Sequence, residues 1–393
     1  MDSDAPIEAQ PTGAATLPPR TVFIAALATA LVGQLGLIFS AFLLPFAMAQ
    51  GRVDAVKASE ILAFEFTAYF LTALLASSVR QFHPARTALF ACIGYAIGSF
   101  ASAATSDFYL FAAARTLCGI GGGAVMVSAN RAVASHIGYE RIFAFVLIGT
   151  SVFGVFGLVT VPGIFENYGS SLTYATLGML AVVAAMFAPW LATGTRSIER
   201  VSMNFGLAGF VMLSAYFFSR LSDAALWPYN ERFGERVGMG ASVIGFVFAG
   251  SAIVAVVGPL VALRFRKLLG VALLFSAVLL AKAASPTLMT TYPSQATFVI
   301  AQFTITLTYV IAGQLFLTFF SKIDATGRLA GLAGTVGLAA DAGGLGVSGQ
   351  SFAAGSFDGI AIASGAIGIA AWVLCLFALI RQARNERSVA IGG

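Results

Sequence analysis

Residues 107–131 read DFYLFAAARTLCGIGGGAVMVSANR, and this stretch decides the fold. It predicts one membrane-spanning helix that carries Arg115 about a third of the way along, followed by Gly119 and the glycine run 121–123. A cation at that depth is costly in hydrocarbon, so Arg115 should face other protein or a water-filled cavity. The glycines let a neighbouring backbone approach closely. We therefore expect this helix inside a bundle.

The composition indicates an integral membrane protein. Of the 393 residues, 59% are hydrophobic and 10% are charged, whereas an ordinary soluble domain carries about 25% charged residues. The mean hydropathy is +0.90. Apolar runs of about 20 residues recur, and each is long enough to cross a hydrocarbon core about 30 Å thick as a helix. The sequence predicts an all-α protein with twelve transmembrane helices, at 21–49, 57–79, 86–105, 107–130, 140–163, 170–193, 203–221, 239–262, 267–285, 294–320, 327–352 and 356–380.

The chain also shows an internal repeat. Arg86 and Lys267 precede the third and ninth predicted helices, and Arg141 and Arg328 precede the fifth and eleventh. Offsets close to half the chain indicate two six-helix halves. The predicted parts are a disordered cytoplasmic tail at 1–20, six-helix bundles at 21–193 and 203–381, a cytoplasmic linker at 194–202, and a cytoplasmic tail at 382–393.

The distribution of basic residues predicts the orientation. Loops on one side, together with the tails, hold most of them: Arg20, Arg80, Arg86, Arg131, Arg141, Arg196, Arg200, Arg264, Arg266, Lys267, Lys322, Arg328, Arg381, Arg384 and Arg387. By the positive-inside rule both termini are cytoplasmic, and we expect a multi-pass protein of the plasma (bacterial inner) membrane. On the opposite side lies the loop 222–240, where Trp227 and Tyr229 are expected at the membrane interface, with a gate as the alternative.

Several function classes find no support in the sequence. It contains no GxxxxGK[ST] phosphate loop, and its three cysteines lie in apolar runs without metal-ligand spacing. No hydrolase-like cluster occurs, so we expect no enzyme, cofactor or metal. The basic residues belong to short loops, which argues against nucleic acid as a partner. The expected partners are a small-molecule substrate, protons and membrane lipid, and we expect a monomer.

The motif in residues 115–123, an arginine followed by spaced glycines, resembles a motif of the major facilitator superfamily. Gly258, Pro259 and Leu260, with Arg264 beyond them, give weaker support. The loop SSVRQFHPAR departs from the family pattern because it has no acidic residue. The resemblance implies two bundles related by a pseudo-twofold axis and transport by alternating access. It also implies that the first, fourth, seventh and tenth helices line a central cavity.

Three charged residues share one layer of the predicted bundle. From the helix rise, Arg115, Glu65 and Asp341 lie roughly 20–24 Å from the basic ends of their helices. We expect Glu65 to pair with Arg115, either as a static ion pair or as a proton-exchanging group.

Asp341 lacks an obvious partner in the sequence. It is a candidate proton carrier, unless Lys282, Arg220 or a hydroxyl satisfies it. Lys282 is expected to extend to the outer interface, and Arg220 to pair locally with Asp223.

Uncharged polar residues complete the predicted site. Together with Arg115, the candidate substrate-binding residues are Gln34, Tyr216, Tyr309, Gln302 and Gln314. The sequence favours a proton-coupled secondary transporter for a small organic solute, anionic or amphipathic. Drug or metabolite efflux by proton antiport is one alternative. A non-transporting receptor or assembly protein with the same fold is another.

Overall fold

The computed structural model describes residues 20–51, 53–79, 83–134, 139–191, 206–255, 258, 264–265, 268–323 and 328–392. Every element assigned within these ranges is helical, which agrees with the predicted all-α class. The predicted tail up to residue 19 and the predicted linker 194–202 lie outside the described residues.

The first half of the chain forms one bundle. Its elements are α1 (Arg20–Gly51), α2 (Ala55–Ser78), α3 (Pro84–Ala104), α4 (Phe108–Ala134), α5 (Tyr139–Phe187) and the short η1 (Ala188–Trp190). Asp54 caps α2 by accepting a hydrogen bond from the backbone N–H of Lys57 at 2.9 Å, and Asp107 does the same for Leu110 at the start of α4. These caps satisfy N–H groups that a helix start leaves unpaired, so they fix where both helices begin.

The second half forms the other bundle. Its elements are α6 (Gly206–Leu226), η2 (Trp227–Tyr229), α7 (Asn230–Arg236), α8 (Ala241–Ala255), α10 (Val271–Thr291), α11 (Gln295–Ile323) and α12 (Arg328–Gly392). The helix α12 continues to Gly392, where the sequence predicted a tail from residue 382.

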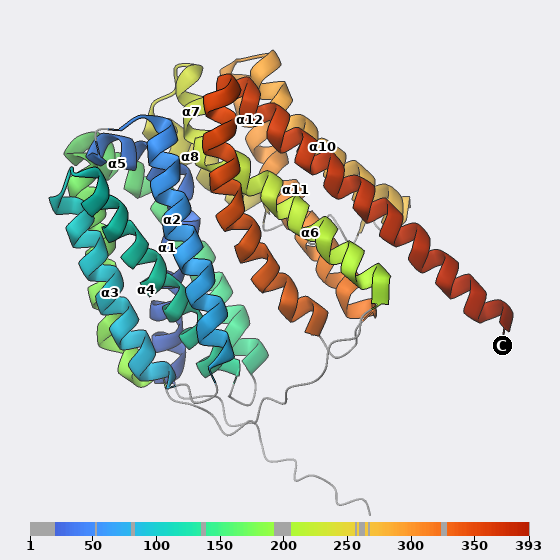
Figure 1. The fold of residues 1–393 in the computed structure, drawn as a ribbon, viewed down its shortest axis with the longest axis horizontal. Helices are drawn as coiled ribbons and strands as arrows, with labels where there is room; N and C mark the ends of the chain where they lie inside the picture. Colours follow the sequence, from blue (N-terminus) through green and yellow to red (C-terminus); the bar gives the residue numbers. More distant parts are fainter. Residues whose placement is uncertain are drawn as a thin grey trace, which may run out of the picture.

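Two of the long helices are interrupted. In α5 the backbone leaves helical geometry at Gly169 (φ 80°), and in α12 it does so at Gly355 and Ser356. A Cβ on Gly359 would overlap the carbonyl oxygen of Ser351, so the chain folds back on itself across the second break. Figure 1 shows α12 as two long segments that meet beside α7. A straight 65-residue helix would be about 98 Å long, far more than a bilayer needs.

The glycines of α4 allow the close packing that the sequence predicted. A Cβ on Gly119 would overlap the carbonyl oxygen of Glu65, and one on Gly123 would overlap that of Tyr69. In the other half, a Cβ on Gly344 of α12 would overlap the Cβ of Ala224 on α6. Close backbone approach through small residues is the usual way in which membrane helices gain packing contacts.

The buried apolar residues show how the two halves are joined. One large cluster contains residues of both halves, among them Phe42 and Phe46 of α1 and Phe248 of α8. Two smaller clusters are confined to one half each. Figure 1 shows the two bundles meeting beside α7 and diverging toward the opposite end. We call the end that carries α7 the closed end, and the end at which α1 begins the terminal end.

Polar contacts also join the halves at the closed end. The hydroxyl of Tyr229 lies 2.7 Å from the Ser59 hydroxyl of α2. Glu166 of α5 accepts hydrogen bonds from the backbone N–H of Ser242, at 3.0 Å, and from its hydroxyl. Tyr229 is completely buried, so its expected place at the membrane interface is wrong. The reason is that its ring stacks on Phe352, with ring centroids 4.8 Å apart, and it packs inside the shared cluster.

Replacing Gly119 by alanine tests the packing of α4 against α2. The added methyl group must push the two backbones apart, so we expect Gly119→Ala to lower the free energy of unfolding by about 1–3 kcal/mol. Gly313→Ala is the control, because a Cβ there meets nothing within 4 Å. Thermal unfolding in detergent measures both variants, and equal melting temperatures would contradict the packing described here.

Candidate functional site

A buried ion pair joins α2 and α4 in the first half. Arg115 donates from Nε to Oε2 of Glu65 at 2.9 Å and from Nη2 to Oε1 at 2.5 Å. The two side chains are 0% and 4% exposed. The predicted partnership of Glu65 and Arg115 is therefore confirmed, in the two-pronged geometry that carboxylates and guanidinium groups favour.

The remaining surroundings of Arg115 leave it no free face. Its Nη1 donates to the sulfur of Cys118 at 3.6 Å, and its guanidinium lies 5.1 Å from the ring centre of Tyr174. A cavity of about 10 Å³ lies beside Glu65, lined by Tyr69 and Tyr95 among others. That space holds about one water molecule. In this state Arg115 thus contacts protein on all sides and offers a solute no surface.

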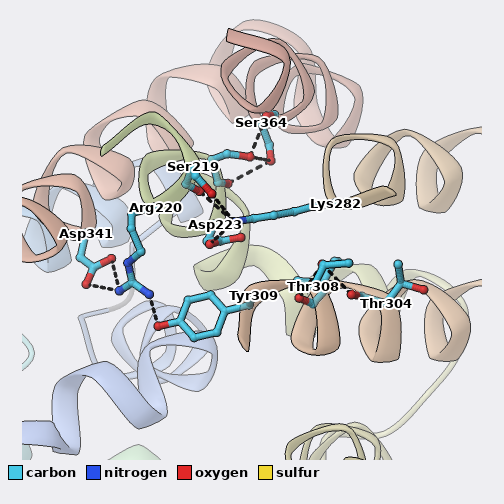
Figure 2. Close-up of polar contacts among 11 residues, drawn as sticks. Ser219, Arg220, Asp223, Lys282, Thr304, Thr308, Tyr309, Asp341 and Ser364 are labelled. Carbon is cyan, nitrogen blue, oxygen red and sulfur yellow. Dashed lines mark hydrogen bonds and ion pairs between the residues drawn. The ribbon is translucent and has the colours of Figure 1, made fainter. Parts of the chain in front are cut away.

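A second ion pair lies in the other half, between α6 and α12. Arg220 donates from Nη2 to both carboxylate oxygens of Asp341, at 2.8 and 2.7 Å. Its Nη1 donates to the hydroxyl of Tyr309, and Figure 2 shows the guanidinium held between the two groups. The side chains of Arg220 and Asp341 are 18% and 11% exposed, more than those of the first pair. Asp341 therefore has a partner, Arg220, which is one of the candidate partners that the sequence offered.

A third ion pair lies deeper in the same half. Lys282 of α10 lies 2.6 Å from Asp223 of α6, and its ammonium donates to the hydroxyl of Ser219 at 2.8 Å (Figure 2). Lys282 is only 4% exposed, so its predicted extension to the outer interface is wrong. The reason is that α10 continues past Pro286 to Thr291, which places Lys282 well inside the helix.

The predicted local pair of Arg220 with Asp223 is also wrong. The two residues lie three apart on α6, but each binds a different helix, Arg220 reaching Asp341 and Asp223 reaching Lys282. The four groups carry no net charge, and together they tie α6 to α10 and α12. Removing any one of them would leave a buried charge without its partner, which costs several kcal/mol.

Tyr69 connects the two halves of the site. It is buried on α2 of the first half and lines the small cavity beside Glu65. It also lies close enough to Asp341 of the second half for the two groups to interact electrostatically. Its hydroxyl has no hydrogen-bond partner among the described residues. Tyr69 thus borders the first ion pair, and its hydroxyl is unpaired within the part of the chain that the structure describes.

The structure groups some of the other predicted residues and separates the rest. Tyr309 bonds Arg220, and the hydroxyl of Tyr216 lies near the same part of α12, 3.3 Å from where a Cβ on Gly337 would stand. Gln302 is fully buried near the closed end, where it accepts a hydrogen bond from Asn230. Gln34 of α1 and Gln314 of α11 are half-buried, and no contact places either one in the Arg220 cluster. The cluster of Arg220, Asp341, Tyr309 and Tyr216 is the candidate site.

Sequence reasoning missed Arg220 as a member of this site. Arg220 lies fourteen residues beyond Gly206, about 21 Å along α6, which is close to the depth estimated for Asp341. Arg220 and Asp341 therefore lie at similar depths, and this similarity is the signal in the sequence that marks them as partners. The sequence placed α6 too early, ending at residue 221 rather than Leu226, which put Arg220 at the interface.

The described residues contain no group of three His, Cys, Asp or Glu side chains that could hold a metal ion. They do contain eight segments long and apolar enough to cross a membrane. The candidate site consists of the ion pair of Arg220 with Asp341 and of two tyrosines, Tyr309 and Tyr216.

Solved structures with a similar fold were found, although no protein-family model matches the sequence and no curated protein sequence does. A peptide transporter POT in complex with sulfate aligns with a TM-score of 0.73 and 13% identity, over 93% of this chain and 95% of the other. An auto-inhibited POT family peptide transporter aligns with a TM-score of 0.74 and 12% identity, over 93% and 97%. Such transporters are members of the major facilitator superfamily. This chain has the major facilitator fold. With its apolar helices, it is an integral multi-pass membrane protein.

Exchanging both members of the first ion pair tests its role in stability. Arg115→Met leaves Glu65 buried and unpaired, so we expect a loss of about 3–5 kcal/mol in unfolding free energy. The double variant Glu65→Leu with Arg115→Met removes both charges and should recover most of that loss. Arg381→Met, at an exposed arginine, is the control. Thermal unfolding in detergent measures these variants together with Glu65→Leu alone, and a double variant as unstable as the sum of the two single changes would contradict this expectation.

Proposed function

We propose that this protein is a secondary active transporter that moves a small organic solute by alternating access, coupled to protons. The observation that carries the proposal is the partly exposed pair of Arg220 and Asp341, bonded to the hydroxyl of Tyr309. Among the described residues, the core that both halves share lies toward the closed end, so a rocking motion about this layer would expose the site to each side in turn.

The proposed architecture is two six-helix bundles with a pseudo-twofold relation, at 21–193 and 203–381. Support comes from the breaks at Gly169 and Ser356, each of which would serve as a turn between two membrane crossings. With α5 and α12 each counted as two crossings, the chain would cross the membrane twelve times. The excess of basic residues near the terminal end favours a cytoplasmic position for that end. The structure would then be an inward-facing state of a plasma (bacterial inner) membrane protein.

The proposed substrate carries a negatively charged group that binds Arg220. Arginine presents donors that match carboxylate and phosphate oxygens, and Arg220 is more exposed than Arg115. Tyr309, at 40% exposed, would supply an aromatic wall with a hydroxyl. The solved peptide transporters with this fold include complexes with sulfate and with alafosfalin. A dipeptide, which has a carboxylate and an ammonium, is therefore one candidate among small organic acids.

Competition for Arg220 would couple the solute to protons. An anionic solute that takes the guanidinium displaces Asp341, and a carboxylate left without a cation in a poorly hydrated site is neutralised by a proton. Solute and proton would then cross together. In this proposal Glu65 is the static partner that neutralises Arg115 and holds α2 against α4. Efflux by proton antiport would need the solute and the proton to bind in alternation and never together. A cationic solute that competes with the proton for Asp341 would meet this requirement.

Removing the guanidinium tests substrate binding. Arg220→Ala loses charge-assisted hydrogen bonds worth about 1.5–3 kcal/mol, so we expect the half-saturating solute concentration to rise about tenfold to a hundredfold. Arg381→Ala removes an exposed arginine of α12 and should leave transport unchanged. Initial uptake rates in proteoliposomes measure both, and an unchanged half-saturation in Arg220→Ala would show that the solute binds elsewhere.

Neutralising Asp341 tests proton coupling. Asp341→Asn cannot exchange a proton, so we expect solute exchange to continue while uphill uptake driven by a pH gradient is lost. Asp358→Asn, at an exposed position of the same helix, should retain both activities. Counterflow and gradient-driven uptake are measured on the same vesicles. Full gradient-driven accumulation by Asp341→Asn would rule out this residue as the proton carrier.

The function itself is tested by counterflow against a panel of solutes. The panel includes mono- and dicarboxylates, dipeptides and a cationic lipophilic dye, each tested with purified protein in proteoliposomes. Saturable exchange of an anionic or zwitterionic solute supports the proposal. Exchange of the cationic dye alone would favour efflux, and absence of flux for every solute would favour a non-transporting role.

A further inference from the structure

The short helix α7 buries a carboxyl group that the proposed transport cycle does not use. Glu231 is 0% exposed, and neither of its carboxyl oxygens has a hydrogen-bond partner among the described residues. Its neighbours along the chain, Asn230 and Phe233, are also buried. A buried ionised carboxylate without a partner is strongly disfavoured, whereas the protonated form carries no net charge.

The chain around Glu231 holds the closed end together. Tyr229, two residues earlier, bonds Ser59 of the first half. Asn230 donates to Gln302 of α11 at 2.9 Å. Arg232, one residue later, donates to the sulfur of Met48 on α1 at 2.9 Å. Glu231 therefore lies where contacts from both halves converge, and separating the halves at this end would uncover it.

The charged groups around Glu231 compensate its charge only in part, through Arg232. On α7, Arg232 is already paired with Glu235 at 2.6 Å, and Arg236 lies over the ring of Phe357. From α5, Glu166 adds a negative charge and is itself bonded to Ser242.

The helices packed against α7 add no further compensating charge, since α12, whose Phe357 packs on Phe233, has the acidic Asp358 next to that contact. The helix α8 contains no charged residue, and the charges of α1 and α11, at Arg20 and Lys322, lie at the terminal end. The segment η2 contributes Tyr229, whose hydroxyl is bonded to Ser59.

We propose that Glu231 is a proton-binding site of the closed end, which takes up one proton from water when this end closes and releases it when the end opens. The carboxylate gains an O–H bond on closing and returns the proton to solvent on opening, so no other reactant is needed. The site is separate from Asp341, because it lies on α7 and not on the helices that hold Arg220. The opening step rests on the proposed alternating access, whereas the protonated carboxyl in the closed state does not.

The electrostatics of the site set the pH range of this effect. Burial, together with the negative charges of Glu235 and Glu166, raises the pKa of Glu231 to about 9, although the positive charge of Arg232 partly offsets them. An exposed glutamate has a pKa of about 4.3. Because the pKa is higher in the closed state, protonation stabilises the closed state relative to the open state. This stabilisation is fully present below about pH 4.3 and is lost as the pH rises through about 9. Between these values the closed-to-open ratio should fall about tenfold per pH unit.

Infrared spectroscopy tests the protonation directly, on the full-length protein in lipid nanodiscs. The difference spectrum between the parent protein and Glu231→Gln at pH 7.5 should contain the carbonyl band of a protonated carboxyl group. That band should disappear as the pH is raised past about 9. Glu60→Gln, an exposed residue of α2, is the control and should show no such band. A difference spectrum with carboxylate bands in place of the protonated band at pH 7.5 would overturn the proposal.

Distance measurements test the link to opening. The three native cysteines are buried, so spin labels can be placed selectively at the exposed positions of Tyr109→Cys and Tyr292→Cys, one in each half at the closed end. Raising the pH from 6 to 9 should lower the population of the closed state, which is seen as the short distance between the two labels. In this background the closed-to-open ratio should fall about tenfold per pH unit, and adding Glu231→Gln should remove that tenfold dependence. Equal pH dependence in both proteins would overturn the link. One unchanging distance in both would also overturn it and would count against alternating access, while the infrared band still decides the proton site.

Discussion

Charge buried within the membrane must be neutralised locally, and this constraint organises the structure. Glu65 neutralises Arg115 within the first half. In the second half, Asp341 neutralises Arg220, and Asp223 neutralises Lys282. Since each of these three pairs joins helices of one half, each bundle is tied together internally. Moving one bundle against the other would separate none of them.

The contacts between the halves are of a different kind. At the closed end they consist of aromatic and aliphatic packing in the shared cluster, with a few hydrogen bonds such as those of Tyr229 and Glu166. Toward the terminal end each half has a core of its own. Apolar and hydrogen-bonded contacts of this type can be exchanged for water or for other contacts without leaving a buried charge unpaired. A joint of this kind is suited to opening and closing.

The sequence predicted the class of fold because composition and helix length depend on the membrane alone. The pair of Glu65 and Arg115 also followed from depth, because their distances from the helix ends are nearly equal. The pairing of Arg220, Asp223 and Lys282 did not follow. It depends on where α6 and α10 end, and an error of five residues moved Arg220 from the interior to the interface.

Other features depend on tertiary packing that no local pattern reveals. Tyr229 and Glu231 look like residues of a polar loop, yet both are fully buried because α7 packs between the two halves. The buried side chains of this loop join α2, α1 and α11, and a gate at this loop stays a prediction. A charge in a short loop is ordinarily solvated, so nothing in the sequence alone marked Glu231 as buried.

A reversible cross-link across the closed end tests the central claim most directly. Glu166 of α5 and Ser242 of α8 bond each other from opposite halves, and both are accessible to reagents. In the variant Glu166→Cys with Ser242→Cys, we expect oxidation to stop solute exchange in proteoliposomes and reduction to restore it. The single variants, oxidised and reduced in the same way, should remain active. Exchange at the full rate while the cross-link is in place would contradict alternating access at this end.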